Sequence, residues 1–235
     1  MSPGLALDGT VTLWGYVRKM VLHTKQVVLE NRRVSRDTYV LRTSRSNEPI
    51  LAGQCFSVGT AGLAINREYS MYSAEDDPFV DFLIRQVEGG AVSTALADLQ
   101  PGDSVEVGGP YGSFCLDRQD VQSRRYVFIA SGTGVAPFSS YVKTFPELDY
   151  VLLHGVRFSD ERYDSDSYAQ DRYIACVSRP EIGEPRRVTQ ALAEIDLNVN
   201  DLYYLCGNRN MITDSIEVLR EKGVPGGQIF METFF

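Results

Sequence analysis

The apolar and polar positions of the chain follow two different patterns on either side of residues 117–125. Before this region, short segments that alternate apolar and polar residues are separated by turn clusters, as at residues 36–43, 54–58 and 79–87. Alternation with a period of two between frequent turns is typical of antiparallel strands. Residues 90–99 form the one candidate helix of this half. The first half therefore predicts an antiparallel barrel or sandwich.

After the polar link at residues 117–120, near-continuous apolar strands alternate with helices. The predicted strands are residues 125–130, 150–153, 173–177 and 202–206, and the predicted helices are residues 136–144, 188–195 and 211–222. This alternation is typical of a doubly wound parallel sheet, whose ligands bind at the carboxyl ends of the strands. We expect two domains, an antiparallel β-barrel at residues 1–118 and an α/β domain with a parallel sheet at residues 119–235.

The composition narrows the class of protein. The chain has 235 residues, 43% of them apolar, and can bury a sizeable core. It has no run of about 18 apolar residues, and residues 1–12 lack the pattern of a signal peptide. Its four cysteines have neither CxxC nor Cys/His metal spacing, which argues against zinc, an iron–sulfur cluster or a disulfide framework. We expect a cytoplasmic monomer with neither a membrane span nor a metal.

The net charge of −8 argues against general binding of nucleic acids, but the charge is unevenly spread. Residues 18–45 carry a local net charge of +6, which leaves −14 for the remainder. The eight basic residues of this stretch are Arg18, Lys19, Lys25, Arg32, Arg33, Arg36, Arg42 and Arg45. Either they lie singly on a solvated barrel surface, or they form a docking patch for an acidic partner.

The tetrapeptide Arg67-Glu68-Tyr69-Ser70 has side chains that together suit a bound flavin. A guanidinium can hold a phosphate through two parallel bonds, a tyrosine ring offers a stacking surface, and a serine hydroxyl can bond a ring nitrogen. Residues 69–74 are predicted as a strand, so Arg67 and Tyr69 should point to one face. The alternative is a surface arginine beside a half-buried tyrosine.

A second candidate site is Ser131-Gly132-Thr133-Gly134-Val135-Ala136-Pro137, at a predicted strand-to-helix turn. Glycines there let the backbone approach a pyrophosphate, and the start of a helix offers free N–H donors. The segment is a Gly-x-Gly-x-x-Pro and lacks the third glycine of the Rossmann fingerprint. Asp149 has the spacing of the usual acidic ribose partner but precedes a strand. A tight turn without a ligand is the alternative.

Cations and a hydroxyl follow two other strands of this half. Arg157 comes after the second strand, Ser178 and Arg179 come after the third, and Arg186-Arg187 open the next helix. If these side chains converge at one edge of the sheet, they would form a cradle for a ribose 2′-phosphate. Ordinary surface arginines are the alternative.

The ends of the last strand and of the chain carry further candidates. Cys206 is followed by Gly207, so its thiol would either touch a ligand ring or pack as a buried structural cysteine. Phe234 and Phe235 end the chain after a charged residue, and two exposed aromatics would waste apolar burial. We expect both rings to pack, either on the core or on a flat cofactor.

Taken in order, these motifs resemble the ferredoxin–NADP reductase superfamily, and most closely its bacterial ferredoxin/flavodoxin–NADP reductases. The resemblance is carried by Arg67-Glu68-Tyr69-Ser70, Gly89-Gly90-Ala91-Val92-Ser93, Gly132-Thr133-Gly134-Val135-Ala136-Pro137, Val177-Ser178-Arg179, Cys206-Gly207-Asn208 and Glu232-Thr233-Phe234-Phe235. It implies a flavin-binding antiparallel barrel joined to an NADP-binding α/β domain.

The resemblance also implies roles for particular residues. Arg67 would grip the FAD pyrophosphate, Tyr69 would stack on the isoalloxazine, and Ser70 would reach its N5. The implied FAD-binding set is Arg67, Glu68, Tyr69, Ser70, Leu83, Ala91, Val92, Ser93, Thr133, Phe234 and Phe235. The implied NADP(H)-binding set is Gly134, Arg157, Ser178, Arg179, Arg187, Gly207 and Met211. Ser70, Cys206 and Glu232 would be catalytic, with Glu232 as a proton or orientation partner.

Two positions depart from the family pattern. Arg209 replaces the proline that usually follows Cys-Gly-Asn, and Phe234 replaces a flavin-covering aromatic that is often tyrosine. Stacking needs only the ring, so neither change removes the chemistry.

The implied activity is that of a FAD-containing oxidoreductase. It would pass hydride between NADP(H) and the flavin, and single electrons between the flavin and a ferredoxin or flavodoxin. The alternative is the reductase component of an oxygenase or hydroxylase, which the Ser178-Arg179 pair and the lack of a Cys-rich segment disfavour. An electron-bridging subunit without nicotinamide turnover and a free-flavin reductase are two further alternatives.

Overall fold

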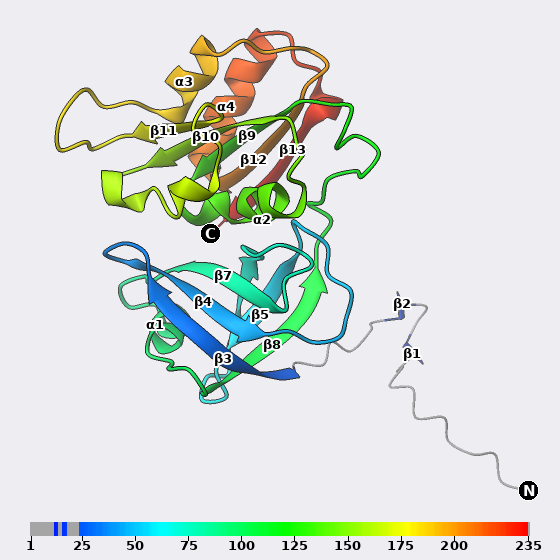
Figure 1. The fold of residues 1–235 in the computed structure, drawn as a ribbon, viewed down its shortest axis with the longest axis vertical. Helices are drawn as coiled ribbons and strands as arrows, with labels where there is room; N and C mark the ends of the chain where they lie inside the picture. The colour runs from blue at the N-terminus through cyan, green and yellow to red at the C-terminus, as the bar shows by residue number, and fades with distance from the viewer. Residues whose placement is uncertain (1–11, 14–15, 18–23, 235) are drawn as a thin grey trace, which may run out of the picture.

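The computed structural model describes residues 12–13, 16–17 and 24–234, which form two domains stacked on one another (Figure 1). Apart from the two-residue strands β1 (Thr12–Leu13) and β2 (Tyr16–Val17), the described chain begins in the barrel. The two-domain architecture predicted from the sequence is confirmed.

The first domain is an antiparallel barrel of six strands. They are β3 (Thr24–Arg33), β4 (Thr38–Ser44), β5 (Cys55–Gly59), β6 (Arg67–Ser70), β7 (Phe79–Arg85) and β8 (Ser104–Tyr111), in the order β6-β5-β8-β3-β4-β7. A single antiparallel bridge between Met71 and Phe82 joins the two edges. Phe56 and Phe82 meet edge to face inside, with ring centroids 5.6 Å apart. The short helix α1 (Ala91–Ala97) packs against β4.

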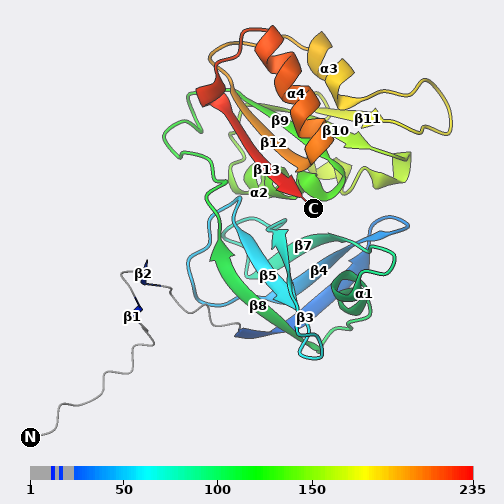
Figure 2. The ribbon, with the colours of Figure 1, turned by 180° about the vertical axis from the view of Figure 1, so that it is seen from behind.

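The second domain is a parallel sheet with helices on both faces. Its strands are β9 (Tyr126–Ser131), β10 (Tyr150–Val156), β11 (Tyr173–Val177), β12 (Leu202–Asn208) and β13 (Ile229–Phe234), in the order β11-β10-β9-β12-β13. The helices α3 (Val188–Glu194) and α4 (Arg209–Glu221) cover one face, and α2 (Ala136–Thr144) lies between the other face and the barrel, as Figure 2 also shows. Short 3-10 turns are η1 (Gly132–Val135), η2 (Ser159–Glu161), η3 (Ser165–Ser167) and η4 (Gly226–Gln228).

Two predicted strand assignments need correction. Residues 69–74 were expected to form one strand, but β6 ends at Ser70, because the chain then crosses toward β7 to close the barrel. There the Tyr72 amide donates to the Asp81 carbonyl at 2.8 Å. The second correction is β13, an edge strand at residues 229–234 where the sequence predicted only a packed tail. Its pairing partner β12 lies far back in the sequence, and such non-local pairing leaves a weak local pattern.

The two domains share a continuous interface. One apolar cluster includes Phe56 of the barrel together with Phe128 and Phe138 of the second domain. Polar contacts also cross the junction: Arg32 donates to both carboxylate oxygens of Asp164 at 3.0 and 2.9 Å. Because the shared apolar cluster and these polar contacts join the two domains, the ends of the barrel strands are fixed relative to the carboxyl edge of the parallel sheet.

Candidate functional site

The tetrapeptide that the sequence singled out forms the whole of β6. Arg67 is exposed, and its guanidinium donates to the neighbouring Asn66 carbonyl at 3.2 Å. Tyr69 is half-buried, and burial raises the pKa of its phenol to about 12. Ser70 is buried, and its Oγ has no hydrogen-bond partner within the described part of the chain. An unpaired buried hydroxyl is costly, so Ser70 has the property expected of a group that bonds a ligand.

The Ala91–Ser93 segment lies near this strand, at the start of α1. The Tyr39 hydroxyl donates to the Ser93 carbonyl at 2.7 Å. Burial raises the pKa of Tyr39, and the nearby Tyr69 raises it further. Tyr39 therefore connects the Ala91–Ser93 segment with β6. The Ser93 hydroxyl itself accepts from the Val87 amide at 3.1 Å, which fixes the turn before the helix. A hollow of about 470 Å³ opens here, lined by Gly89, Gly90, Ala91, Thr94, Ala95 and Asp98.

Two members of the predicted FAD set pack inside the protein. Val92 and Leu83 are each 3% exposed and belong to the apolar cluster that spans both domains. Their side chains support the surface from beneath, and any contact with a ligand would come from their backbone. Thr133, in η1, is half-buried.

The predicted dinucleotide turn lies where β9 meets β12. At Gly134 a side chain would come within 2.4 Å of the Cys206 carbonyl oxygen, so only glycine allows this close packing. Gly132 has φ +54° and open space where a side chain would be, so its backbone is accessible. The Gly132 carbonyl accepts from the imidazole of His154 at 2.9 Å, a contact that the sequence did not predict.

Charged groups from both domains meet beside this turn. Cys206 of β12 and Glu232 of β13 are register partners, and the Glu232 Oε2 is buried without a hydrogen-bond partner among the described residues. Burial, followed by the charge of Glu68 on β6, raises the pKa of Glu232 to about 7. Burial and then Glu232 also raise the pKa of Cys55, the register partner of Ser70, to about 11. Ser70, Cys206 and Glu232 therefore gather around one junction between the domains.

The predicted phosphate cradle divides into two parts. Arg157 is tied to other side chains: its Nε donates to Glu161 at 2.8 Å, and its Nη2 donates to Asp37 of the barrel at 2.8 Å. These two partners raise the pKa of Arg157 above its usual range. Arg179 and Arg187 are exposed, and the described structure gives their guanidinium groups no partner.

Ser178 and Arg187 are brought close together by the backbone. The Arg186 amide donates to the Val177 carbonyl at 2.9 Å, so Arg187, the residue before α3, lies near the end of β11. The Ser178 hydroxyl donates to the Val156 carbonyl at 3.1 Å and keeps its lone pairs available.

The remaining predicted residues lie around the end of β12. Gly207 has φ +130°, and a side chain there would come within 2.4 Å of the Ser131 hydroxyl. Met211 is half-buried on α4, and its sulfur accepts from Ser215 at 3.6 Å. Arg209 is the first residue of α4, a position that also suits proline, which explains how either residue fits there.

At the end of the chain, Phe234 is the last residue of β13. It is half-buried and packs against the shared apolar cluster. Phe235 lies outside the described residues.

The basic stretch is partly neutralised by its surroundings. Arg32 pairs with Asp164, and Arg42 donates to both oxygens of Asp81 at 2.8 and 2.9 Å. Arg45 donates to two backbone carbonyls at 2.7 Å. Arg18 and Lys19 lie outside the described residues. The exposed cations left for a partner are Lys25, Arg33 and Arg36.

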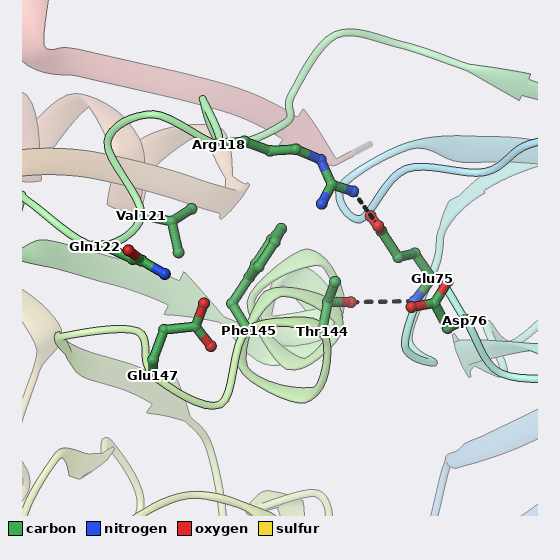
Figure 3. A pocket seen from close by; sticks show the side chains of 8 residues that line it. All are labelled: Glu75, Asp76, Arg118, Val121, Gln122, Thr144, Phe145 and Glu147. Carbon is green, nitrogen blue, oxygen red and sulfur yellow. Dashed lines mark hydrogen bonds and ion pairs between the residues drawn. The ribbon is translucent and has the colours of Figure 1, made fainter.

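A second hollow, of about 330 Å³, lies at the boundary between the domains and contains none of the predicted site residues. Figure 3 shows Arg118 of the linker paired with Glu75, whose amide donates to Thr144 at 3.1 Å. Glu147 and Gln122 line the opposite side. We interpret this hollow as a structural contact between the domains, because the guanidinium that lines it, that of Arg118, already pairs with Glu75. No helix in the described part of the chain is long and apolar enough to cross a membrane.

Comparison with known proteins agrees with this arrangement. Residues 25–115 match the oxidoreductase FAD-binding domain, and residues 128–216 match the oxidoreductase NAD-binding domain. The electron transfer component of toluate 1,2-dioxygenase from Pseudomonas putida is 30% identical over 228 residues, which are 89% of this chain and 67% of that relative. The chain belongs to the ferredoxin reductase-type family of FAD- and NAD(P)-binding oxidoreductases.

Other members of this family are similarly related. The reductase component of propane 2-monooxygenase from Rhodococcus jostii is 30% identical, with coverage of 77% of this chain but only 55% of that relative. A cytochrome P450 reductase from Amycolatopsis superposes with a TM-score of 0.80 at 26% identity, covering 95% of this chain and 73% of the other. Both family domains have a counterpart here, and the unpaired Ser70 hydroxyl, the open Gly132 backbone and the exposed Arg67 fit a flavin and a dinucleotide.

Proposed function

We propose that this oxidoreductase takes electrons from NADPH, in preference to NADH, and delivers them through FAD to a ferredoxin or flavodoxin. The observation that carries the proposal is the junction at which Ser70 of the barrel, Cys206 of β12 and Glu232 of β13 converge. FAD supplies the exchange between hydride transfer and single-electron transfer, while the protein supplies position and electrostatics.

In this proposal, each residue has a limited task. Arg67 and the backbone of the Ala91–Ser93 segment hold the FAD pyrophosphate, and Tyr69 offers a ring for stacking. Ser70 Oγ bonds the flavin ring, which satisfies its otherwise unpaired hydroxyl. Glu232, with its pKa near 7, exchanges a proton at Oε2 in a site that the two domains shield from water. The Cys206 thiol stays protonated, because burial and then Glu232 raise its pKa well above the usual value.

The proposed preference for NADPH rests on Ser178, Arg179 and Arg187. Their exposed cations and free lone pairs suit a 2′-phosphate at the edge of the sheet. Arg157, predicted as a fourth member of this set, is committed to Glu161 and Asp37. We propose that it orients this edge against the barrel.

Steady-state kcat/KM with NADPH and with NADH tests the proposal. We expect NADPH to be preferred by roughly a hundredfold to ten-thousandfold, since each of two arginines supplies about 1.5 to 3 kcal/mol to a phosphate. The Arg179→Ala/Arg187→Ala double variant should lose this preference, because its kcat/KM for NADPH falls while its kcat/KM for NADH stays unchanged. The matched Arg157→Ala variant should lower the melting temperature and affect both nucleotides equally. Equal kcat/KM values for the unaltered protein would overturn the assignment.

A second candidate acceptor is the terminal component of an oxygenase. It is favoured by the names of the relatives, which belong to toluate dioxygenase and propane monooxygenase systems. Reduction rates measured with a ferredoxin, a flavodoxin and an oxygenase component decide between these acceptors.

A further inference from the structure

The structure contains a buried histidine whose contacts have no part in the function proposed above. His154 is on β10, is 0% exposed, and uses both ring nitrogens. Its Nε2 lies 2.9 Å from the Gly132 carbonyl oxygen, and its Nδ1 lies 2.9 Å from the Tyr173 hydroxyl. Gly132 is the first residue of the dinucleotide turn η1, and Tyr173 begins β11.

These contacts determine where the proton of the imidazole lies. A carbonyl oxygen can only accept, so Nε2 must carry the proton that is donated to Gly132. The ring is neutral because burial lowers the pKa of His154 to about 4, so Nδ1 is bare and accepts from the Tyr173 hydroxyl. With both nitrogens occupied and no exposed surface, His154 has no free atom for a ligand or for acid–base chemistry.

The environment of His154 extends to the other domain. Its ring centroid is 5.9 Å from that of Tyr163, whose hydroxyl lies 3.2 Å from the Thr38 hydroxyl of the barrel. Among the described residues, the carboxylate of Glu161 is the charged group that acts on the imidazole, and it is already paired with Arg157. The imidazole is therefore held on several sides, and its hydrogen bond to the Gly132 carbonyl connects it to the predicted nucleotide site.

We propose that His154 is a positioning residue for nicotinamide nucleotide binding: locked with its proton on Nε2, it holds the Gly132 carbonyl and thereby aims the η1 backbone at the bridging pyrophosphate. Gly132 is the first residue of η1, and its φ of +54° with open space at the Cβ position suits glycine, so the His154 donor sets the direction of a carbonyl at a backbone position that other residues rarely adopt. Fixed donors bind and orient a ligand better than mobile ones, because the cost of ordering them has already been met. The inference rests on the proposed function for the identity of the ligand.

Two ligands separate this role from a merely structural one. NADP⁺ carries the bridging pyrophosphate, whereas 2′-AMP carries only the 2′-phosphate that Ser178, Arg179 and Arg187 would hold. Removing the imidazole should therefore weaken NADP⁺ and leave 2′-AMP unchanged.

The test compares His154→Leu with His154→Gln in the FAD-loaded protein by calorimetry. Leucine has a similar volume but cannot bond Gly132, whereas the glutamine amide can replace the Nε2 donor. We expect His154→Leu to weaken NADP⁺ binding by roughly tenfold, the size expected for the loss of one hydrogen bond. His154→Gln should restore most of the affinity, and neither variant should change 2′-AMP binding or flavin content. Unchanged NADP⁺ affinity in a folded His154→Leu protein would overturn the proposal.

A second measurement needs no substitution at His154. The chain has two histidines, so ¹⁵N-histidine NMR gives two imidazoles, and His23→Gln assigns them. We expect His154 to be neutral with a protonated Nε2 from pH 5 to pH 8, and Tyr173→Phe should move only its Nδ1 resonance. A protonated Nδ1 would overturn the proposal, even if His154→Leu fails to fold. If the unaltered protein binds neither 2′-AMP nor NADP⁺, the proposed function fails while the tautomer result still stands.

Discussion

Glu232 and Cys206 lie in register on the parallel strands β13 and β12, and the buried Oε2 of Glu232 has no partner among the described residues. The thiol beside it is a weak donor and stays neutral, so it does not stabilise a negative charge on the carboxylate. Glu68 faces the same carboxylate from the barrel and disfavours its ionisation. The junction therefore holds a carboxyl group that gains or loses its proton near neutral pH.

The first prediction concerns stability and pH. Folded Glu232 has its pKa raised to about 7, so between the unfolded value and pH 7 the folded protein binds the proton more tightly than the unfolded chain. The free energy of unfolding of the flavin-free protein should therefore fall as pH rises from about 4.5 to 7, by on the order of 1 to 3 kcal/mol. Glu232→Gln should remove this slope, as measured by urea unfolding at several pH values. Glu217→Gln, on the exposed face of α4, should leave it intact.

Glu232 should also affect the rate of hydride transfer. Glu232→Ala should slow the hydride step in stopped-flow measurements by more than it weakens NADPH binding. If the variant binds NADPH less tightly but transfers hydride at the normal rate, Glu232 has a binding role and is not a proton partner.

The second prediction concerns FAD. Arg67 is exposed and has no carboxylate partner among the described residues, so Arg67→Ala should leave the melting temperature of the flavin-free protein unchanged. It should weaken FAD by roughly tenfold to 150-fold, because a charge-assisted bond contributes about 1.5 to 3 kcal/mol. Fluorescence titration with FAD measures this effect. Arg36→Ala, another exposed barrel arginine, is the control, and equal FAD affinity in both variants would contradict a role for Arg67.

The third prediction concerns the end of the chain. Phe234 is half-buried on the face of β13 that also carries Glu232, and a stacked aromatic pair is worth only about 0.5 to 1.5 kcal/mol beyond burial. A ring with so little stacking energy can yield to a nicotinamide. Deletion of residues 234–235 should therefore tighten NADP⁺ binding, shift the flavin absorption spectrum and disturb turnover.

Phe230→Ala provides the control for that deletion. Phe230 is on the same face of β13 and stacks on Tyr204, with centroids 4.6 Å apart. It should lower stability without altering the flavin spectrum. If the deletion also leaves both the spectrum and the NADPH kinetics unchanged, Phe234 packs on the core alone.

The fourth prediction concerns partner docking. Electron transfer to an acidic ferredoxin or flavodoxin should slow as ionic strength rises, whereas reduction of a small neutral acceptor should barely change. Arg33→Glu/Arg36→Glu should slow the protein acceptor selectively. Arg32 is unsuitable for this test, because its reversal would break the pair with Asp164 and disturb the domain interface. Unchanged rates with the protein acceptor would remove the basic stretch from the docking surface.

Most of the fold could be predicted from local patterns in the sequence. The apolar strands around residues 126–131 and 202–208, and the glycine turn between β9 and α2, follow rules that involve only neighbouring residues. The β13 strand could not be predicted in this way, because its identity as a strand depends on pairing with β12. The same holds for the end of β6, which is set by closure of the barrel at Met71 and Phe82.

The motifs of the site could be predicted from the sequence, but the ion pairs and hydrogen bonds of their side chains could not. Residue type and position suggested Arg157 as a phosphate ligand, yet its charge is used by Glu161 and by Asp37, a residue of the other domain. No pattern along the chain indicates a pair between residues so far apart. His154 was visible near a strand end, but its role depends on the facing carbonyl of Gly132.

The apolar cluster that passes from Phe56 and Phe82 in the barrel to Phe128 and Phe138 beneath the parallel sheet has a thermodynamic consequence. Two halves that share one core cannot melt independently, so a ligand that binds only one half stabilises both. A dinucleotide at the edge of the sheet should therefore protect the barrel from unfolding, and a flavin on the barrel should protect the face of the parallel sheet that α2 covers. Binding at either site should therefore raise the melting temperature of the whole protein.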